Sequence, residues 1–215
     1  MNTLAVVATA YKINDDIIER FLKYNSHIEN LFLVTDSKII GDYNRIQCPN
    51  QEIFSIAKTA NLGIRQAVDA GFDVVLKTDI DCIITQGVLN YCQELPARMA
   101  ACWRYYHLRD PDKLDESWQD TKCIGSAAMH AQAWEEVNGY NENMKGYGFD
   151  DGDLRWRARA LGLTMPTLIK PHLYHVWHEE KHNRETINPF LRVKNIAMRK
   201  DKYDNPEWGK FIDIE

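Results

Sequence analysis

Two carboxylates separated by one residue follow an apolar segment of strand length. Asp79 and Asp81 come at the end of the run FDVVLKTDID, residues 72–81. In extended backbone, residues i and i+2 point to the same side, so both carboxylates can face one cation. Carboxylate oxygens suit Mg²⁺ or Mn²⁺, which typically join a protein carboxylate to substrate phosphates. The alternative interpretation is a strand end that only contacts solvent. The pair alone does not decide between this and a cation site.

Three histidines recur at a spacing of three near the end of another strand-like segment. His172, His175 and His178 fall in the stretch PHLYHVWH, residues 171–178. If the backbone turns there, His175 and His178 can reach a common metal ion. Imidazole beside carboxylate favours Mn²⁺ over Mg²⁺. The alternative is that His172 and His175 are partly buried side chains that only make hydrogen bonds.

The segment HEEKH, residues 178–182, also matches the H-E-x-x-H pattern of zinc hydrolases. That motif requires an amphipathic helix that buries the glutamate and both histidines. Here the surrounding residues are polar on all sides, and Pro171 and Pro189 lie on either side of the segment. A zinc-dependent hydrolase is therefore kept as an alternative function.

A second acidic pair stands in a glycine-rich stretch, GYGFDDGD, residues 146–153. Glycines allow the backbone to approach a ligand closely. Asp150 and Asp151 fall at the expected start of a helix, where the helix dipole favours their ionised forms. A carboxylate placed there can act as a general base towards a hydroxyl group. The alternative is an acidic first turn that only caps the helix.

The elements that must position these residues alternate between strands and helices. The apolar runs at 3–10, 31–35 and 72–77 predict buried strands, and the helical patterns at 14–24 and 51–70 separate them. This alternation predicts an α/β fold with a mixed, mostly parallel sheet flanked by helices in a single domain. Ligands of such sheets bind at the carboxyl ends of the strands, and the polar residues expected there are Thr9, Tyr11, Asp36, Asp79 and Asp81.

The second half of the chain is less regular. It is expected to contain a helix at 86–95, strands at 98–107, 123–129 and 168–177, and helices around 134–137 and up to 160. A polar, turn-rich loop is expected over 108–122, and Trp118 within it is expected to face a substrate rather than the core. No GxGxxG follows the first strand, and the chain has no GxxxxGK[ST]. The sequence therefore lacks the phosphate-binding loops of dinucleotide-dependent dehydrogenases and P-loop proteins.

Composition bounds the class of protein. The 215 residues carry a net charge of −5 and are 45% hydrophobic, which disfavours both disorder and general nucleic-acid binding. No apolar run approaches the ~20 residues that span a bilayer. Five cysteines without a CxxC spacing indicate free thiols in a reducing compartment. We therefore expect a cytoplasmic protein without a transmembrane segment.

Taken together, three separated motifs resemble those of GT-A-fold nucleotide-sugar glycosyltransferases. The similarity is to the family that holds the β-1,4-galactosyltransferases, the catalytic half of the polypeptide N-acetylgalactosaminyltransferases and bacterial chondroitin-type polymerases. The motifs are AKTANLGI at 57–64, similar to the family's A-x-x-x-N-x-G; TDID at 78–81, its D-x-D; and NGYNE at 138–142 followed by GYGFDD at 146–151, similar to N-G-[FWY]-[DP]-E and G-W-G-x-[ED]-D. The resemblance runs from the first strand to about residue 188.

The resemblance implies a UDP-sugar donor, Mn²⁺ (or Mg²⁺) as cofactor, and a role for each matching residue. Thr9 and Asp36 would contact the uracil and ribose, with Tyr11, Lys58 and Asn61 nearby. Asp81 would bind the metal directly, with His178 and His175 as further ligands, while Asp79 would help through the ribose or a water. Asp150 would hold the acceptor, and Asp151 would be the catalytic base. Tyr147 and Phe149 stand where the family usually has Trp and Gly, which affects the identity of the acceptor.

The implied reaction moves a hexose or N-acetylhexosamine from a UDP-sugar to an acceptor hydroxyl. A carboxylate at position 151 predicts inversion at the anomeric carbon. The acceptor could be a glycan, a glycolipid, a protein or a modified nucleic acid. The catalytic domain is expected over 1–190, with a nucleotide-binding half at 1–81, an acceptor half at 82–190, and a tail at 191–215 that packs on the domain. A non-catalytic UDP-sugar-binding module is the further alternative.

Overall fold

The computed structural model describes residues 1–11, 13–39, 41–49, 51, 55–146, 148–177, 189–198 and 203–210, with the backbone alone for 120–124 and 189–192. The strands are β1 (Leu4–Ala10), β2 (Leu31–Thr35), β3 (Asn44–Gln47), β4 (Val74–Asp79), β5 (Cys82–Ile84), β6 (Ala101–Leu108), β7 (Trp118–His130) and β8 (Thr167–Val176). The α-helices are α1 (Asp15–Tyr24), α2 (Ile56–Asp69), α3 (Gln86–Gln93), α4 (Ala131–Glu136), α5 (Asp150–Ala160) and α6 (Pro189–Met198), and a short 3₁₀ helix spans Leu114–Glu116.

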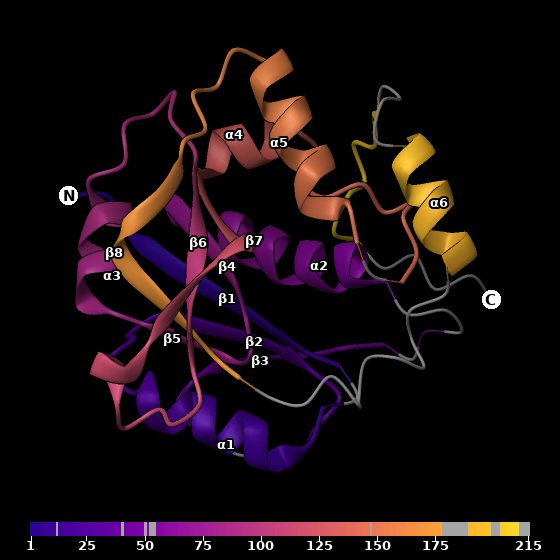
Figure 1. Cartoon of the computed structure of the whole chain (residues 1–215). Coiled ribbons are helices and arrows are strands. Elements are labelled where there is room, and N and C mark those ends of the chain that lie inside the picture. The colour runs from indigo at the N-terminus through magenta and orange to yellow at the C-terminus, as the bar shows by residue number, and fades with distance from the viewer. Residues whose placement is uncertain are drawn as a thin grey trace.

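All eight strands form one sheet in the order β3-β2-β1-β4-β7-β6-β8-β5 (Figure 1). The pairs β1–β2, β1–β4, β2–β3 and β6–β8 are parallel, whereas β4–β7, β6–β7 and β5–β8 are antiparallel. The predicted fold class, a mixed and mostly parallel α/β sheet in one domain, is confirmed. Because β1 lies between β2 and β4, the carboxyl ends of these three strands meet at one edge of the sheet.

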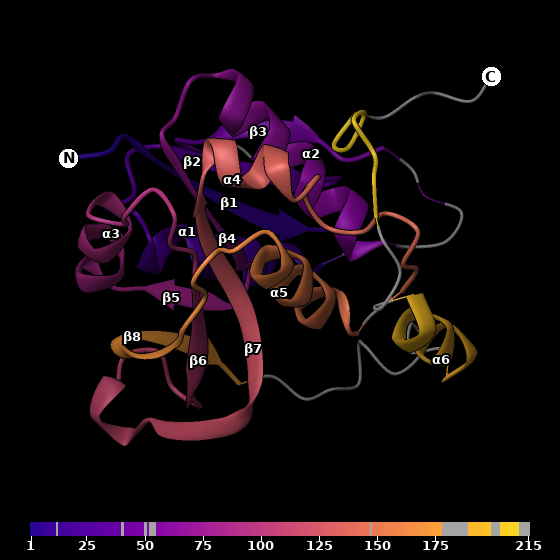
Figure 2. The same cartoon turned by 90° about the horizontal axis from the view of Figure 1, so that it is seen from above.

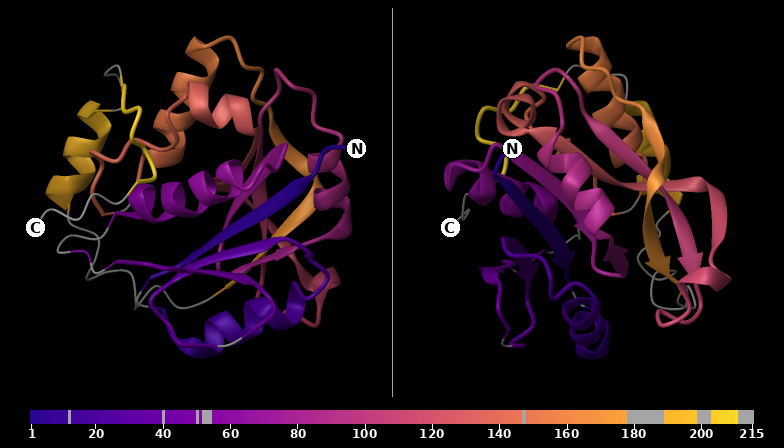
Figure 3. Two further views of the ribbon diagram at one scale, coloured as in Figure 1. Left: turned by 180° about the vertical axis from the view of Figure 1, so that it is seen from behind. Right: turned by 90° about the vertical axis from the view of Figure 1, so that its left-hand side faces the viewer.

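Helices cover both faces of the sheet (Figures 1 and 3). Val7 and Val34 point into a core shared with α2, α4 and α5, while Val6 and Leu33 point into a second core shared with α1 and α3. The first core also contains Trp208, which follows α6 in the chain. Burial on both faces explains why β1, β2 and β4 are almost continuously apolar rather than alternating.

Helix α2 packs closely on the sheet at Gly63. A Cβ atom there would lie 2.5 Å from Val7 Cγ1 and 2.6 Å from Val34 Cγ2. We expect Gly63→Ala to lower the free energy of unfolding by about 1–3 kcal/mol, because the added methyl group overpacks the core. Urea unfolding measures this change. Gln66→Ala, at an exposed position of the same helix, is the control and should stay within about 0.5 kcal/mol of wild type. Equal stability of the two variants would contradict this packing.

Three parts of the second half differ from the prediction. The loop expected over 108–122 is wrong in part, because β7 begins at Trp118 and continues for 13 residues. Strand β5 and helix α6 were not predicted. Each is short, 3 and 10 residues, and β5 is defined by its pairing with β8 rather than by a pattern of its own.

The segment 203–210 packs on the domain. Trp208 is buried beneath the Arg65 guanidinium, 4.6 Å from the ring centroid. The backbone N–H of Gly209 donates to Glu142 Oε1 at 2.7 Å. The domain boundaries expected from the sequence remain predictions. Among the described residues, no helix is both long and apolar enough to cross a membrane.

Candidate active site

Asp79 is the last residue of β4, and both of its carboxylate oxygens accept hydrogen bonds. Lys77 Nζ donates to Oδ1 and Tyr105 Oη donates to Oδ2, each at 2.7 Å. Gly125 of β7 permits this approach, since a Cβ there would lie 2.4 Å from Tyr105 Oη and 2.6 Å from Asp79 Oδ2. Asp79 is therefore held in one orientation by three strands, β4, β6 and β7.

Asp81 lies in the turn between β4 and β5 and faces a histidine from far along the chain. Strands β5 and β8 pair with Cys82 opposite His175. As a result, His175 Nε2 lies 3.1 Å from Asp81 Oδ2. Burial alone would lower the pKa of His175, but the neighbouring Asp81 carboxylate outweighs burial and raises it. The structure thus brings together two of the predicted metal ligands.

The donor atoms at this point fit a hard divalent cation. Ligand atoms of Asp79, Asp81 and Cys82 lie within 4.8 Å of one another. Burial and the two carboxylates hold the pKa of the Cys82 thiol well above its usual range, and the protonated thiol is a poor metal ligand. The remaining donors are carboxylate oxygens and the imidazole of His175, a set that suits Mn²⁺. His178 and the whole HEEKH segment lie outside the described residues.

Asp150 and Asp151 begin helix α5, as predicted. The residue before them, Phe149, has a left-handed backbone with φ of 71°, which turns the chain sharply into the helix. Asp150 is buried, and Asp151 Oδ1 accepts a hydrogen bond from Tyr140 Oη at 3.3 Å. Burial raises the pKa of Asp151 well above its usual range, and the adjacent Asp150 carboxylate raises it further, while Lys77 opposes both effects. Burial likewise raises the pKa of Asp150.

Lys77 lies between the two acidic pairs. Its side chain is 2% exposed, and its ammonium lies 5.8 Å from the centroid of the Tyr140 ring. Burial alone would lower the pKa of Lys77, but the carboxylates of Asp79 and Asp151 raise it well above its usual range. One buried, charged lysine thus faces both the D-x-D pair and the pair at α5. No feature of the sequence singled it out.

The loop that leads to Asp150 is held by a side chain of helix α2 and by the residue that caps this helix. Asn61 of α2 is fully buried, donating to the carbonyl of Tyr140 and to Glu142 Oε1 at 2.8 Å and accepting from the N–H of Tyr140 at 2.7 Å. Ser55 Oγ donates to the carbonyl of Met144 at 2.9 Å. Asn61 therefore positions the loop through contacts within the protein. We therefore assign Asn61 to positioning this loop rather than to contact with a bound nucleotide-sugar.

Helix α6 supplies a further contact that the sequence did not indicate. The buried Asn195 side chain donates to the carbonyls of Lys145 and Gly148 at 2.9 and 3.2 Å, and accepts from the N–H of Lys145 at 3.3 Å. The pairing joins residues 50 positions apart, which sequence spacing does not reveal. Figure 2 shows α6 beside the N-terminal end of α5.

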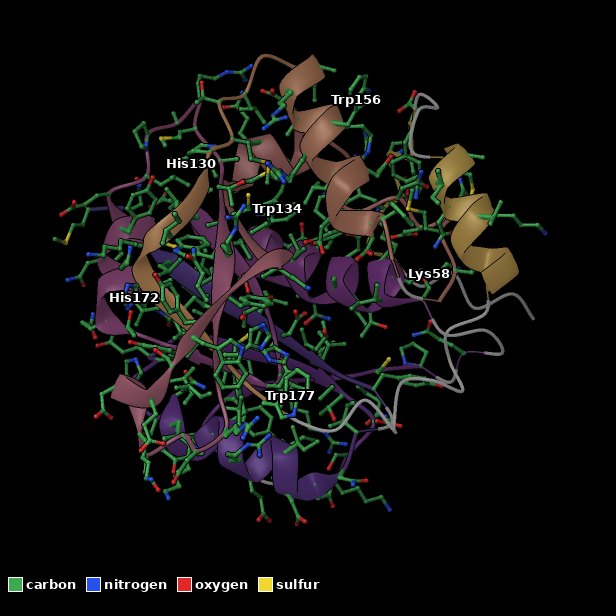
Figure 4. All side chains as sticks on the ribbon, viewed as in Figure 1. Lys58, His130, Trp134, Trp156, His172 and Trp177 are labelled. Carbon is green, nitrogen blue, oxygen red and sulfur yellow. The ribbon has the colours of Figure 1, made fainter. Side chains whose placement is uncertain are left out.

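The residues expected to bind the nucleotide lie along the neighbouring strand ends. Thr9 of β1 is in register with both Val34 of β2 and Asp79 of β4. Asp36 follows β2 and is exposed. Tyr11 is buried, and its Oη accepts from the N–H of Gln51 at 3.1 Å. Lys58 is partly exposed in the first turn of α2 (Figure 4). These placements bring Thr9, Asp36 and Asp79 to one sheet edge.

The family model described as the N-terminal domain of galactosyltransferase matches residues 112–179. This segment contains β7, the NGYNE and GYGFDD motifs, Asp150, Asp151 and His175. A sequence search of curated proteins finds no match.

Solved structures share the fold over nearly the whole chain. The catalytic domain of Drosophila β1,4-galactosyltransferase 7, in complex with xylobiose, superposes with a TM-score of 0.62 at 15% identity, covering 95% of this chain and 82% of that one. A mutant of that Drosophila enzyme with manganese, UDP-Gal and xylobiose superposes with a TM-score of 0.57 at 16% identity, covering 94% of this chain and 82% of that one.

GalNAc-T7 with UDP, GalNAc and Mn²⁺ gives a TM-score of 0.66 at 10% identity, covering 93% of this chain and 47% of that one. The chain thus spans about half the length of GalNAc-T7. The resemblance drawn from the three motifs is confirmed by these findings. The chain therefore has the GT-A fold of these glycosyltransferases, and its residues 112–179 match the galactosyltransferase family model.

Proposed function

We propose that the chain transfers a hexose or N-acetylhexosamine from a UDP-sugar to an acceptor hydroxyl with inversion at the anomeric carbon. The observation that carries this proposal is the convergence of two acidic pairs on one buried cation. Asp79 accepts a hydrogen bond from Lys77, and the Asp151 carboxylate helps to raise the pKa of the same lysine. The proposed metal-binding pair and the proposed general base would therefore act at one site, as transfer from a nucleotide diphosphate requires.

The donor would lie along the ends of β2, β1 and β4. Thr9, Tyr11 and Asp36 would border the uridine, and Lys58 would lie nearby on α2. Asp81, His175 and His178 are the proposed metal ligands, and Asp79 would assist through the ribose or a water. A bound Mn²⁺, or Mg²⁺ in its place, would neutralise charge on the departing diphosphate. The manganese, UDP and UDP-Gal bound to the structural neighbours support this assignment.

The proton transfer would be made by the pair at α5. Asp150 would hold the acceptor, and Asp151 would take the proton from its hydroxyl as the oxygen bonds to the anomeric carbon. The bond from that carbon to the diphosphate oxygen breaks on the opposite face, and UDP leaves with the electron pair. An acceptor glycan, glycolipid, protein or modified nucleic acid could supply the hydroxyl.

Release of UDP from a panel of UDP-sugars, with Mn²⁺ and then with EDTA, tests the proposal. We expect hydrolysis of one donor, and we expect it to depend on Mn²⁺. Its rate should fall at least ~100-fold in Asp81→Asn, because Asp81 is proposed to bind the metal directly. Loss of a group that only contacts a metal ligand already lowers metal affinity or activity by up to ~100-fold. Asp69→Asn, at the exposed far end of α2, is the control and should behave as wild type.

Two outcomes would favour the alternatives. UDP binding without turnover of any donor indicates a non-catalytic binding module. Zn²⁺-dependent hydrolysis that is indifferent to Asp81→Asn would favour a hydrolase that uses residues 178–182. Retention at the anomeric carbon, measured by NMR of the product, would contradict the inverting mechanism.

A further inference from the structure

One buried tyrosine contacts both sides of the candidate metal site. Tyr105 lies in β6 and is 4% exposed. Its hydroxyl donates to Asp79 Oδ2 at 2.7 Å. Its ring stacks on the imidazole of His175, with the ring centroids 5.5 Å apart and an interplanar angle of 20°. Because His175 Nε2 lies 3.1 Å from Asp81 Oδ2, Tyr105 touches one residue of the D-x-D pair directly and the other through a histidine.

A chain of hydroxyl groups fixes the direction of the bond from Tyr105 to Asp79. Tyr105 Oη lies 3.1 Å from Ser126 Oγ, and Ser126 Oγ lies 3.0 Å from Thr78 Oγ1. A phenol has one hydrogen to donate. Because that hydrogen goes to the Asp79 carboxylate, Ser126 donates to Tyr105, and Thr78 donates to Ser126. Ser126 and Thr78 are at most 1% exposed, so the protein rather than solvent directs the tyrosine hydroxyl towards Asp79.

The register of the sheet places the Tyr105 ring beside His175. Strands β6 and β8 are parallel, with Tyr105 in register with Leu173 and His107 in register with His175. As residues i and i+2 of one strand, Tyr105 and His107 lie on the same face. The His107 ring contacts the His175 ring at 4.8 Å and an interplanar angle of 67°. Two aromatic rings therefore restrict the rotamers of His175 and keep its Nε2 towards Asp81.

We propose that Tyr105 is a positioning residue for the divalent cation of the active site. This inference rests on the proposed function and assigns a further residue to that same site. The hydroxyl orients the Asp79 carboxylate, and the ring orients the imidazole of His175, a proposed metal ligand. A group that is already held in its bound orientation loses less conformational entropy when the metal binds. Loss of such a support typically lowers metal affinity or activity by ~10–100-fold.

Binding of Mn²⁺ to the full chain tests the proposal, measured by electron paramagnetic resonance of the free ion with and without UDP. Tyr105→Phe keeps the ring and removes the hydroxyl, so we expect it to weaken Mn²⁺ binding about tenfold. Ser126→Ala removes the donor to Tyr105 and should weaken the binding about threefold.

Tyr106→Phe is the matched control, because it makes the same substitution at the neighbouring residue. The Tyr106 ring stacks on His172 at 4.2 Å. The carbonyl of His172 accepts from Thr85 Oγ1 at the cap of α3 (Figure 4). Tyr106→Phe should therefore bind Mn²⁺ as wild type does.

Tyr105→Leu tests the ring, since it keeps apolar volume but removes both the hydroxyl and the flat face. Imidazole favours Mn²⁺ over Mg²⁺. Loss of the support for His175 should therefore weaken Mn²⁺ binding further, to about 100-fold below wild type. Binding of Mg²⁺, measured by its competition with Mn²⁺, should fall no further than in Tyr105→Phe. Such a change of selectivity distinguishes the positioning of a nitrogen ligand from a general loosening of the core.

The number of Mn²⁺ sites per chain separates positioning from a merely structural role. A structural role would lower that number and leave the affinity of the remaining sites unchanged, whereas positioning lowers the affinity itself. Thermal unfolding of each metal-free variant records any loss of fold, and Ser126→Ala decides if Tyr105→Phe does not fold. Wild-type Mn²⁺ affinity in Tyr105→Phe and Ser126→Ala would overturn the proposal, and so would a wild type that does not bind Mn²⁺.

The same preparations keep this inference distinct from the proposed function. Mn²⁺ affinity that depends on Tyr105, without UDP release from any donor, would contradict the proposed function and support the role of Tyr105 at the metal site. Mn²⁺-dependent UDP release with equal Mn²⁺ affinity in wild type and Tyr105→Phe would support the proposed function and overturn the role of Tyr105.

Discussion

Replacing Asp151 by asparagine is expected to lower the turnover number for sugar transfer by roughly 10²–10⁴-fold, the usual contribution of a general base. The amide keeps the shape of the side chain but cannot take the proton of the acceptor hydroxyl. Binding of UDP should change little by comparison, since the proposed donor contacts lie at β1, β2 and the D-x-D. Single-turnover transfer with saturating donor measures the effect.

The pH dependence of wild type gives a second readout of the same group. Only the deprotonated carboxylate can accept a proton, so the rate is present above the pKa of Asp151 and is lost as the pH falls through it. Because burial and Asp150 raise that pKa, we expect the acidic limb at a higher pH than for an ordinary aspartate. Tyr140→Phe removes a hydrogen bond to the carboxylate, which should move the limb higher still.

Two results would contradict this role. Turnover of Asp151→Asn within tenfold of wild type would assign the proton transfer to another group. An acidic limb that Tyr140→Phe leaves in place would show that the limb reports a different residue. Thermal unfolding of each variant serves as the check that the site is intact.

Replacing Lys77 by methionine is expected to lower the free energy of unfolding by about 3 kcal/mol, because breaking a buried ion pair leaves its partner without compensation. Lys77 and Asp79 are 2% and 27% exposed at the side chain and lie 2.7 Å apart. Their partial contact with water places the estimate at the lower end of the range for buried pairs. Urea unfolding measures it.

An exposed ion pair of similar geometry provides the control. Lys113 lies 3.0 Å from Glu116, with side chains 53% and 64% exposed. Because such pairs contribute about 0–1 kcal/mol, Lys113→Met should change stability far less. The double variant Lys77→Met/Asp79→Asn should recover part of the loss, since it removes the orphaned charge. Equal effects at Lys77 and Lys113, or no recovery, would show that the buried pair does not stabilise the fold.

Much of the fold follows from local patterns. Continuous apolar runs at β1, β2 and β4 identify strands buried on both faces, and the 3.6-residue pattern of Ala57, Ala60 and Ile64 identifies the face of α2 that meets them. The Asp79/Asp81 and Asp150/Asp151 pairs stand out because they fall at the end of a strand and the start of a helix. Such short sequence patterns predict structure because the interactions that cause them act within a few residues.

Other parts of the structure depend on pairing across the sheet. Strand β5 has only 3 residues and exists because it pairs with β8. The first five residues of β7, WQDTK, are mostly polar, and the sequence predicted a loop there. Their pairing with β6 makes them a strand. Polar residues cannot signal such a strand, since its stability comes from backbone hydrogen bonds to a partner.

The sequence by itself determined the class of fold, both acidic pairs and, through three motifs, the resemblance to glycosyltransferases. Only the tertiary structure decided that Lys77 faces both acidic pairs, that Asn61 and Asn195 hold the loop before α5, and that Tyr105 contacts both Asp79 and His175. The physical reason is distance along the chain. Strand order and register bring these side chains together, and both are set by the whole sheet and its two cores rather than by any local pattern of residues.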